Sequence, residues 1–113
     1  MANTFKVKTK LSVTSSSGSP DTIYTVPSAT TSVIVGLTLA NTSASSAAIT
    51  ATVKLENNDG DNITLLKNAP IPAGSSLEVM SGNKIVMEAS DILKAYASAS
   101  SSMDCALSLM EIT

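Results

Sequence analysis

The sequence predicts an all-β fold, an antiparallel β-sandwich or jelly roll of about eight or nine short strands. Several segments alternate apolar and polar residues with a period of two, which is typical of strands with one buried face. Turn-forming residues separate these segments at short intervals, as in antiparallel sandwiches. No segment has a helical period long enough for a crossover helix, which argues against a parallel α/β fold.

The first predicted strand lies near the N-terminus. The apolar residues of one parity are Phe5, Val7, Leu11 and Val13. The lysines of the other parity are Lys6, Lys8 and Lys10. This alternation predicts a half-buried strand whose lysines form a solvated row that protects an edge from wrong pairing.

A Ser- and Gly-rich segment at residues 15–21 follows this strand, and a short strand is expected at residues 22–26, before Pro27. We therefore divide the chain into an N-terminal strand or arm with a Ser/Gly-rich linker, residues 1–20, and a β-sandwich domain, residues 21–113. A chain of 113 residues is long enough for one continuous core and too short for two.

A central strand is expected at residues 31–41 and a half-buried strand at residues 49–56, joined by a turn at residues 42–46. Gly36 indicates a bulge or a close approach in the first of them. The residues of this strand that are expected to share a face are Val33, Val35, Leu37 and Leu39. The sequence Asn-Asn-Asp-Gly at residues 57–60 tolerates positive φ and predicts a reversal into the next strand.

The second half of the chain continues with short strands and turns. The expected strands are residues 63–66, 77–80, 85–88, 92–98 and 105–112. The expected turns are residues 70–74, 81–83 and 100–102.

Charged residues make up only 14% of the chain, against a typical share of roughly 25%. A surface with so little charge predicts that part of the exterior is covered in an oligomer or a larger particle. The alternative is a small domain kept soluble by its hydroxyl groups. The net charge is −2 and there is no Arg, so we expect no nucleic-acid partner, because phosphate contacts need clustered cations.

Cys105 is the only cysteine, which rules out an intrachain disulfide and predicts reduced, intracellular assembly. The N-terminal residues lack the apolar stretch of a signal peptide, and nowhere do about 18 apolar residues run together. We therefore expect neither secretion by that route nor a membrane span.

Catalytic chemistry has little support in this sequence. There is no His, which removes the commonest general base and zinc ligand. Glu56, Asp59 and Asp61 are close in sequence, but turns attract such residues for backbone reasons. An EF-hand frame on the same turn would place Leu55 and Leu66 where carboxylates are required. We expect no enzyme, no metal site and no cofactor.

Tyr24 and Tyr96 are the residues best suited to stack on a sugar or a partner. Each lies within a strand pattern, which favours packing in the core or a groove with a hydrogen-bonded hydroxyl group.

Several segments together resemble small virion proteins of tailed bacteriophages. They are residues 23–27, 33–41, 67–80, 83–99 and 106–112. In those proteins a strand follows a Pro-Ala-Gly turn. A strand preceded by a lysine and then a tight acidic turn and another strand come next, and the final strand ends in a pair like Glu-Ile. Ser90 stands where the family often has Gly, so its turn either avoids positive φ or is slightly strained.

The resemblance implies a non-enzymatic β-sandwich that forms a homo-oligomer, with a trimer as the expected state, in a virion assembled in the host cytoplasm. The first hypothesis is a capsid decoration or cement protein that contacts neighbouring major capsid subunits. The second places the same fold in the neck, collar, tail or fibre attachment. A third hypothesis, from the fold class, is a carbohydrate-binding module. The candidate partner-contact residues are Phe5, Lys6, Val7, Lys8 and Lys10.

Overall fold

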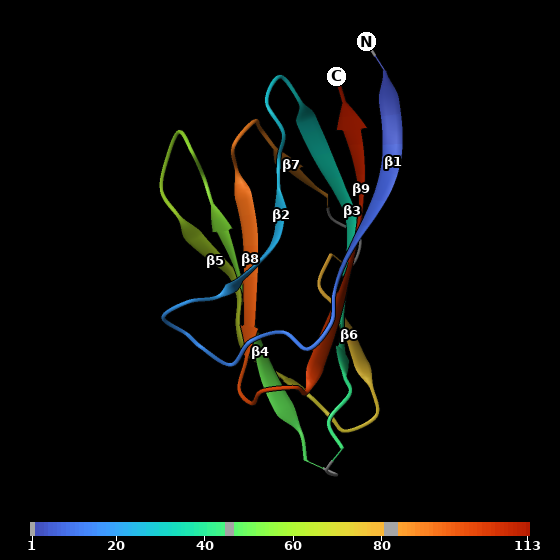
Figure 1. Cartoon of the computed structure of the whole chain (residues 1–113), viewed down its shortest axis with the longest axis vertical. Coiled ribbons are helices and arrows are strands. Elements are labelled where there is room, and N and C mark those ends of the chain that lie inside the picture. Colours follow the sequence, from blue (N-terminus) through green and yellow to red (C-terminus); the bar gives the residue numbers. More distant parts are fainter. Residues whose placement is uncertain (1, 45–46, 81–83) are drawn as a thin grey trace.

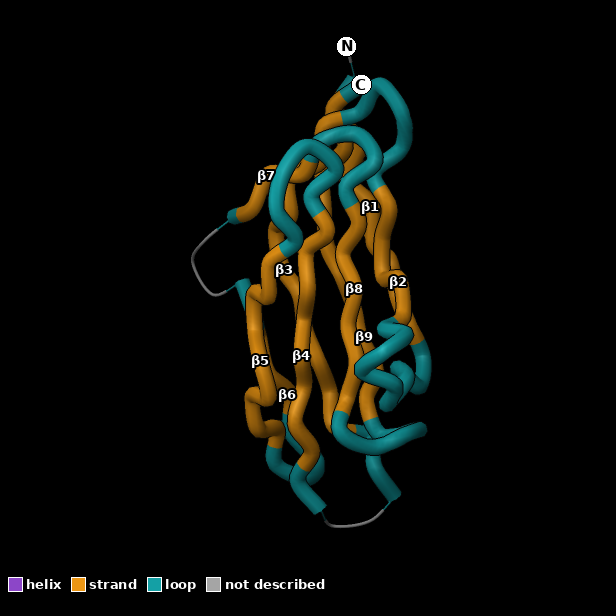
Figure 2. Tube along the Cα trace, turned by 90° about the vertical axis from the view of Figure 1, so that its left-hand side faces the viewer, coloured by secondary structure: helices purple, strands orange, loops and turns teal. Residues whose placement is uncertain are grey.

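The computed structural model of the chain describes residues 2–44, 47–80 and 84–113. The regular secondary structure in these residues is entirely β-strand, and Figure 2 shows the strands joined by loops. The nine strands of the described residues are β1 (Asn3–Lys10), β2 (Asp21–Thr25), β3 (Thr31–Asn41), β4 (Ile49–Glu56), β5 (Ile63–Ile71), β6 (Ser76–Glu78), β7 (Ile85–Met87), β8 (Ile92–Ala97) and β9 (Met103–Ile112).

The strands form two antiparallel sheets that pack face to face (Figure 1). In the five-stranded sheet the order is β1-β9-β3-β6, and β7 also pairs with β3. The four-stranded sheet has the order β2-β8-β4-β5. The predicted antiparallel sandwich is therefore confirmed.

The core lies between the two sheets and consists mainly of aliphatic residues, which alternate with outward residues along strands such as β3, β8 and β9. The five-stranded sheet contributes the buried residues Ile34, Leu37, Leu39, Leu107 and Leu109. The four-stranded sheet contributes Ile49, Ala51, Val53, Leu93 and Ala95. In β4 the apolar residues Ile49, Ala51 and Val53 are buried as the alternation predicts, but Thr52 of the polar parity is buried as well.

A bulge interrupts β3 where it pairs with β9, between Ile34 and Gly36. This confirms the bulge expected at Gly36. The expectation that Val33 and Val35 share a face with Leu37 is wrong, because the extra residue of a bulge reverses the parity that follows it. Ile34 and Leu37 are buried, whereas Val35 is exposed on the opposite side of the sheet.

The apolar side of the first strand points to solvent, whereas the sequence predicts that it points to the core. β1 pairs with β9 along its whole length, so residues 3–10 form the outermost strand of the five-stranded sheet. The prediction of a half-buried strand is wrong, since Phe5 and Val7 are exposed. Val13 is buried, because the chain turns at Ser12, whose φ is 54°. The division of the chain at residue 20 stays a prediction.

The predicted reversal at residues 57–60 is confirmed, with the Gly60 N–H donating to the Asn57 carbonyl over 3.3 Å. None of these four residues has a positive φ, so the turn does not use the conformation for which they were singled out. The turn expected at residues 70–74 begins later, because β5 continues to Ile71 and includes Pro70. A proline is tolerated there because β5 is an edge strand. Ser90 has a φ of 74°, which is the strained form of its turn. The turn expected at residues 81–83, and residues 45–46 of another, lie outside the described residues.

Candidate interaction surface

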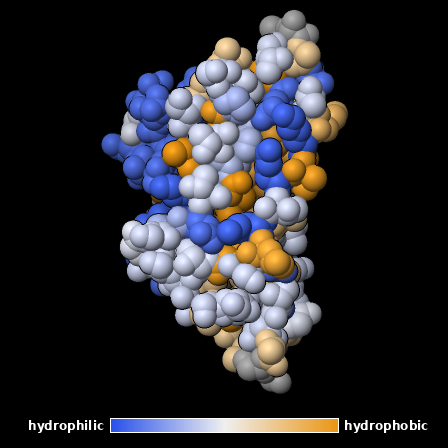
Figure 3. Space-filling view, in the orientation of Figure 1, coloured by the Kyte–Doolittle hydropathy of each residue, from blue (hydrophilic) through white to orange (hydrophobic). Residues whose placement is uncertain are grey.

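The side of the five-stranded sheet that points away from the core, here called the outer face, carries a row of apolar side chains. In the strand register Phe5 lies opposite Met110, Met110 opposite Val33, and Val33 opposite Val86. The row therefore crosses β1, β9, β3 and β7. Figure 3 shows hydrophobic side chains at the margin that β1 forms in Figure 1.

Most of the exposed large hydrophobic residues in the described part of the chain lie on this face. They are Phe5 (77% exposed), Val7 (63%), Leu11 (75%), Val35 (43%) and Val86 (60%). The remaining one, Ile63, is 49% exposed and belongs to β5 of the other sheet. Single exposed apolar residues are normal, but a contiguous group on one face indicates an interaction surface.

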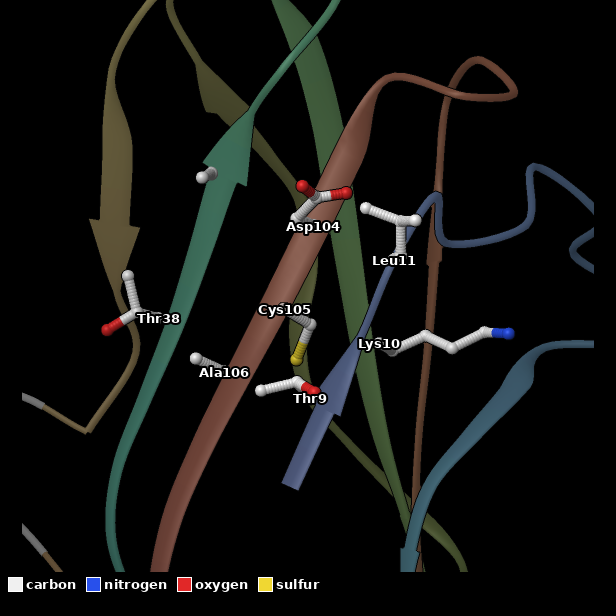
Figure 4. Close-up of a pocket in the computed structure, with 8 residues that line it drawn as sticks. Thr9, Lys10, Leu11, Thr38, Asp104, Cys105 and Ala106 are labelled. Atoms are coloured by element: carbon white, nitrogen blue, oxygen red, sulfur yellow. The ribbon is translucent and has the colours of Figure 1, made fainter. Parts of the chain in front are cut away.

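Small side chains leave two hollows on the outer face, beside these apolar residues. The larger one has a volume of about 320 Å³ and lies where β1, β9 and β3 run side by side (Figure 4). Its lining residues are Thr9, Lys10, Leu11, Thr38, Ala40, Asp104, Cys105 and Ala106. The second, of about 260 Å³, lies between Val7 and Val35 above Ser108. Apolar groups of a partner could enter both hollows.

Two carboxylates at this face already have hydrogen-bond donors within the chain. Asp104 accepts a hydrogen bond from the Ser12 N–H over 2.9 Å. Glu78 accepts from the Leu37 N–H over 2.9 Å and from the Thr38 hydroxyl over 2.7 Å. Desolvation opposes ionisation of Glu78, but these hydrogen bonds outweigh it and lower its pKa. A partner could therefore cover this face without leaving these carboxylates unpaired.

The opposite side of β1 takes part in a polar network that reaches the four-stranded sheet. Lys6 Nζ lies 2.9 Å from Glu111 Oε1. The Tyr24 hydroxyl donates to Glu111 Oε2 over 2.5 Å and lies 2.6 Å from Ser32 Oγ. Burial of Tyr24 and its bond to Glu111 raise the pKa of Tyr24 to about 12. Hydrogen bonds from Tyr24 and Lys6 lower the pKa of Glu111. The network joins β1, β9, β3 and β2.

The structure thus separates the candidate partner-contact residues into two groups on one strand. Phe5 and Val7 belong to the outer face, whereas Lys6 and Lys8 lie beside β2. Lys10 extends away from β9 and β3 (Figure 4).

The sequence reasoning missed the contribution of β3 and β7 to the outer face. The sequence could have assigned Val35 to the outer face, because a bulge at Gly36 puts the residue before it on the opposite side of the sheet from Leu37. Val86 has no such signal, because its side depends on which residue of β3 it pairs with.

The other candidate residues form no comparable site. Tyr24 is buried, and Tyr96 is half-buried with Lys54 Nζ 6.0 Å from the centre of its ring. Asp59 and Asp61 are exposed in the turn after β4. No group of three or more Cys, Asp or Glu side chains in the described residues is arranged to hold a metal ion.

Cys105 is buried, and burial raises the pKa of its thiol to about 12. The described residues contain no helix long and apolar enough to cross a membrane.

No protein-family model matches the sequence, and no curated protein matches it. Among solved structures, the chain is similar to one from the infectious bursal disease virus Gx strain, at 17% identity and a TM-score of 0.50. It is also similar to one from the crystal structure of the infectious bursal disease virus VP2 subviral particle, at 15% identity and a TM-score of 0.49. Both matches cover 96% of this chain, which spans 33% and 32% of the viral chains.

A third similar structure is Eiger TNF from S. frugiperda, at 10% identity and a TM-score of 0.44, covering 96% of this chain and 93% of the other. At these identities the likeness concerns the fold alone. The comparisons therefore show that the chain shares its all-β sandwich with a chain of a virus structure.

Proposed function

We propose that the protein is a non-enzymatic structural subunit of a virus particle, in which neighbouring subunits cover its outer face. The observation that carries this proposal is the orientation of β1. Its apolar residues Phe5 and Val7 point to solvent, although burying one such side chain stabilises a protein by about 1.5–3 kcal/mol. The isolated chain does not gain this energy, whereas a contact with another subunit would.

Two further observations support the proposal. The low content of charged residues suits a protein whose exterior is partly covered. The sandwich is similar over 96% of the chain to part of a chain from the infectious bursal disease virus Gx strain. A virus particle is built from many copies of a few chains, so self-association is part of the proposal, with a trimer as the expected state.

The finer position in the particle rests on the sequence resemblance to virion proteins of tailed bacteriophages. We place the protein on the head as a decoration or cement protein that contacts neighbouring major capsid subunits. Many such contacts would add up to a strong attachment even if each is weak. The alternative position is the neck, collar, tail or fibre attachment.

The test is a double substitution on the outer face, Phe5→Ser with Val7→Thr. Neither side chain packs in the core, so the variant should fold like the wild type. We expect it to lose about 2–4 kcal/mol per subunit contact, or about 30- to 1,000-fold in Kd. Light scattering would measure the solution mass. Sedimentation would measure binding to phage heads that lack the protein, and their resistance to heat would be compared with and without it.

The matched control is Ile63→Thr, which removes an exposed apolar side chain from the other sheet. We expect it to leave mass and binding unchanged. Binding to neck or tail components instead of heads would support the alternative position. A wild-type protein that is monomeric and binds no phage component would contradict the proposal.

A further inference from the structure

We propose that the free edge of β1 binds an extended segment of a different protein in which acidic and apolar residues alternate. β1 is the terminal strand of its sheet, and it pairs with β9 on one side from Asn3 to Lys10. None of the strands in the described residues pairs with its other side. The backbone groups on that side can therefore accept an added strand. The inference does not depend on the protein being a virion subunit.

The space beside this edge is open. A hollow of about 230 Å³ lies between β1 and β2, which is itself the edge of the other sheet. Lys6, Lys8, Tyr24 and Glu111 are among its lining residues. A strand added to β1 would place every second side chain over this hollow.

The charges beside the hollow define what those side chains should be. Lys6 is already paired with Glu111. In the described residues, no carboxylate lies within 4.0 Å of Lys8 or Lys10. Cross-strand pairs of opposite charge stabilise a sheet, so acidic residues fit beside these two lysines.

The other side chains of the added strand would lie next to Phe5 and Val7, at the margin of the outer face. These two residues are largely exposed, and apolar neighbours would cover part of their surface. The partner segment therefore alternates between acidic residues on one side and apolar residues on the other.

The free edges of a second copy of the chain do not have this pattern. A second β1 would bring its own lysines opposite Lys8 and Lys10, and like charges directly opposite destabilise a sheet. β5 contains Lys67 and no acidic residue. β2 contains one, Asp21, which already accepts a hydrogen bond from the Thr14 N–H over 2.8 Å. At the other edge of the five-stranded sheet, β7 contains no acidic residue and β6 contains only Glu78, which already accepts hydrogen bonds from the Leu37 N–H and the Thr38 hydroxyl. The lysine row thus excludes the chain's own edges and favours an acidic partner.

A capped eight-residue peptide that alternates Glu and Val is the probe, since β1 has eight residues. We expect it to bind the wild-type protein, more weakly at high salt, and to slow hydrogen exchange at the β1 amides that do not bond to β9. The control peptides are one that alternates Lys and Val, one with four Glu followed by four Val, and an N-methylated form of the probe. These peptides should bind at least about 10-fold more weakly, because each lacks the charge, the alternation or the backbone donors of the probe.

The matched variants reverse the charge of lysines on the two edges. Lys8→Glu with Lys10→Glu should weaken binding of the Glu-Val peptide by about 10-fold or more and improve binding of the Lys-Val peptide. Lys67→Glu, on the edge of the other sheet, should change neither. The double variant keeps Phe5 and Val7, so it should still bind phage heads if the proposed function holds.

Three outcomes would overturn the inference. The first is no binding of the Glu-Val peptide to the wild type at millimolar concentration, in which case the lysines only protect the edge. The second is equal binding of the Lys-Val or N-methylated peptide. The third is slowed exchange that maps to β5 rather than β1.

Discussion

Removing the Tyr24 hydroxyl should destabilise the protein substantially, because that group joins the two sheets. It donates to Glu111 Oε2 in β9 and is hydrogen-bonded to Ser32 Oγ in β3. Tyr24 itself lies in β2 of the other sheet. The substitution Tyr24→Phe keeps the ring in place and removes both hydrogen bonds.

The expected loss follows from the charge and burial of the partners. A hydrogen bond to a charged group contributes roughly 1.5–3 kcal/mol, and a neutral one roughly 0.5–1.5 kcal/mol. Glu111 keeps Lys6 as a partner, and Ser32 can rotate its hydroxyl, so the two terms should not add fully. We expect Tyr24→Phe to lower the free energy of unfolding by about 2–3 kcal/mol at pH 7.

The effect should depend on pH through Glu111. Tyr24 and Lys6 lower the pKa of Glu111 below its ordinary value of 4.5 in the folded protein. A carboxyl group with a lowered folded-state pKa contributes stability above its unfolded-state pKa and loses it as the pH falls through the folded-state value. The difference between wild type and Tyr24→Phe should therefore be constant above about pH 5.5 and shrink below pH 4.5.

Urea unfolding at several pH values would measure both effects, with Tyr96→Phe as the matched control. The Tyr96 hydroxyl has no hydrogen-bond partner among the described residues, so its removal should cost less than about 0.5 kcal/mol. The reasoning would be refuted if Tyr24→Phe cost no more than Tyr96→Phe, or if its cost stayed the same down to pH 3.

Two further outcomes follow from single side chains. Cys105 should resist a thiol reagent at pH 8 in the folded protein, because burial raises the pKa of its thiol to about 12, and it should react after unfolding in denaturant. Mass spectrometry would measure the labelling, and rapid labelling of the folded protein would contradict this expectation. Glu78→Gln should lower the free energy of unfolding by about 1 kcal/mol, since the hydrogen bonds that Glu78 accepts from Leu37 and Thr38 hold β6 against β3 beside its bulge. The loss should be no larger because these hydrogen bonds are partly exposed to solvent. An unchanged midpoint of urea unfolding would count against this role.

The sequence predicts most of the fold because local rules and tertiary packing agree there. In β4 the apolar residues Ile49 and Val53 are buried, and the turn at residues 57–60 contains Asn57, whose side-chain oxygen accepts a hydrogen bond from the Asp59 N–H over 3.1 Å. Gly36 likewise indicates the bulge in β3. In β4 the residue pattern predicts both the strand and its buried side, whereas in β3 it predicts the strand and the bulge but not the side on which Val33 and Val35 lie.

The candidate surface could be predicted only in part, because alternation shows that two sides of a strand differ but not which side meets the core. For β1 the answer depends on residues distant in sequence. Glu111 and Tyr24 occupy the space on the inner side of β1 and provide a partner for Lys6. An amine with a long aliphatic stem suits that place better than the ring of Phe5.

Phe5 and Val7 are therefore exposed because the register of β1 is fixed, and not because the strand is loosely attached. A slip of one residue in the pairing of β1 with β9 would exchange its two faces and turn these side chains inward. Such a slip would separate Lys6 from Glu111 and strain the link to Val13, which is buried and whose N–H donates to the Met103 carbonyl over 2.7 Å. Because both ends of the register are fixed in this way, the apolar row is positioned over the hollows of the outer face before any partner arrives. A partner that binds there need not order this strand, so the ordering cost does not reduce the affinity of the contact.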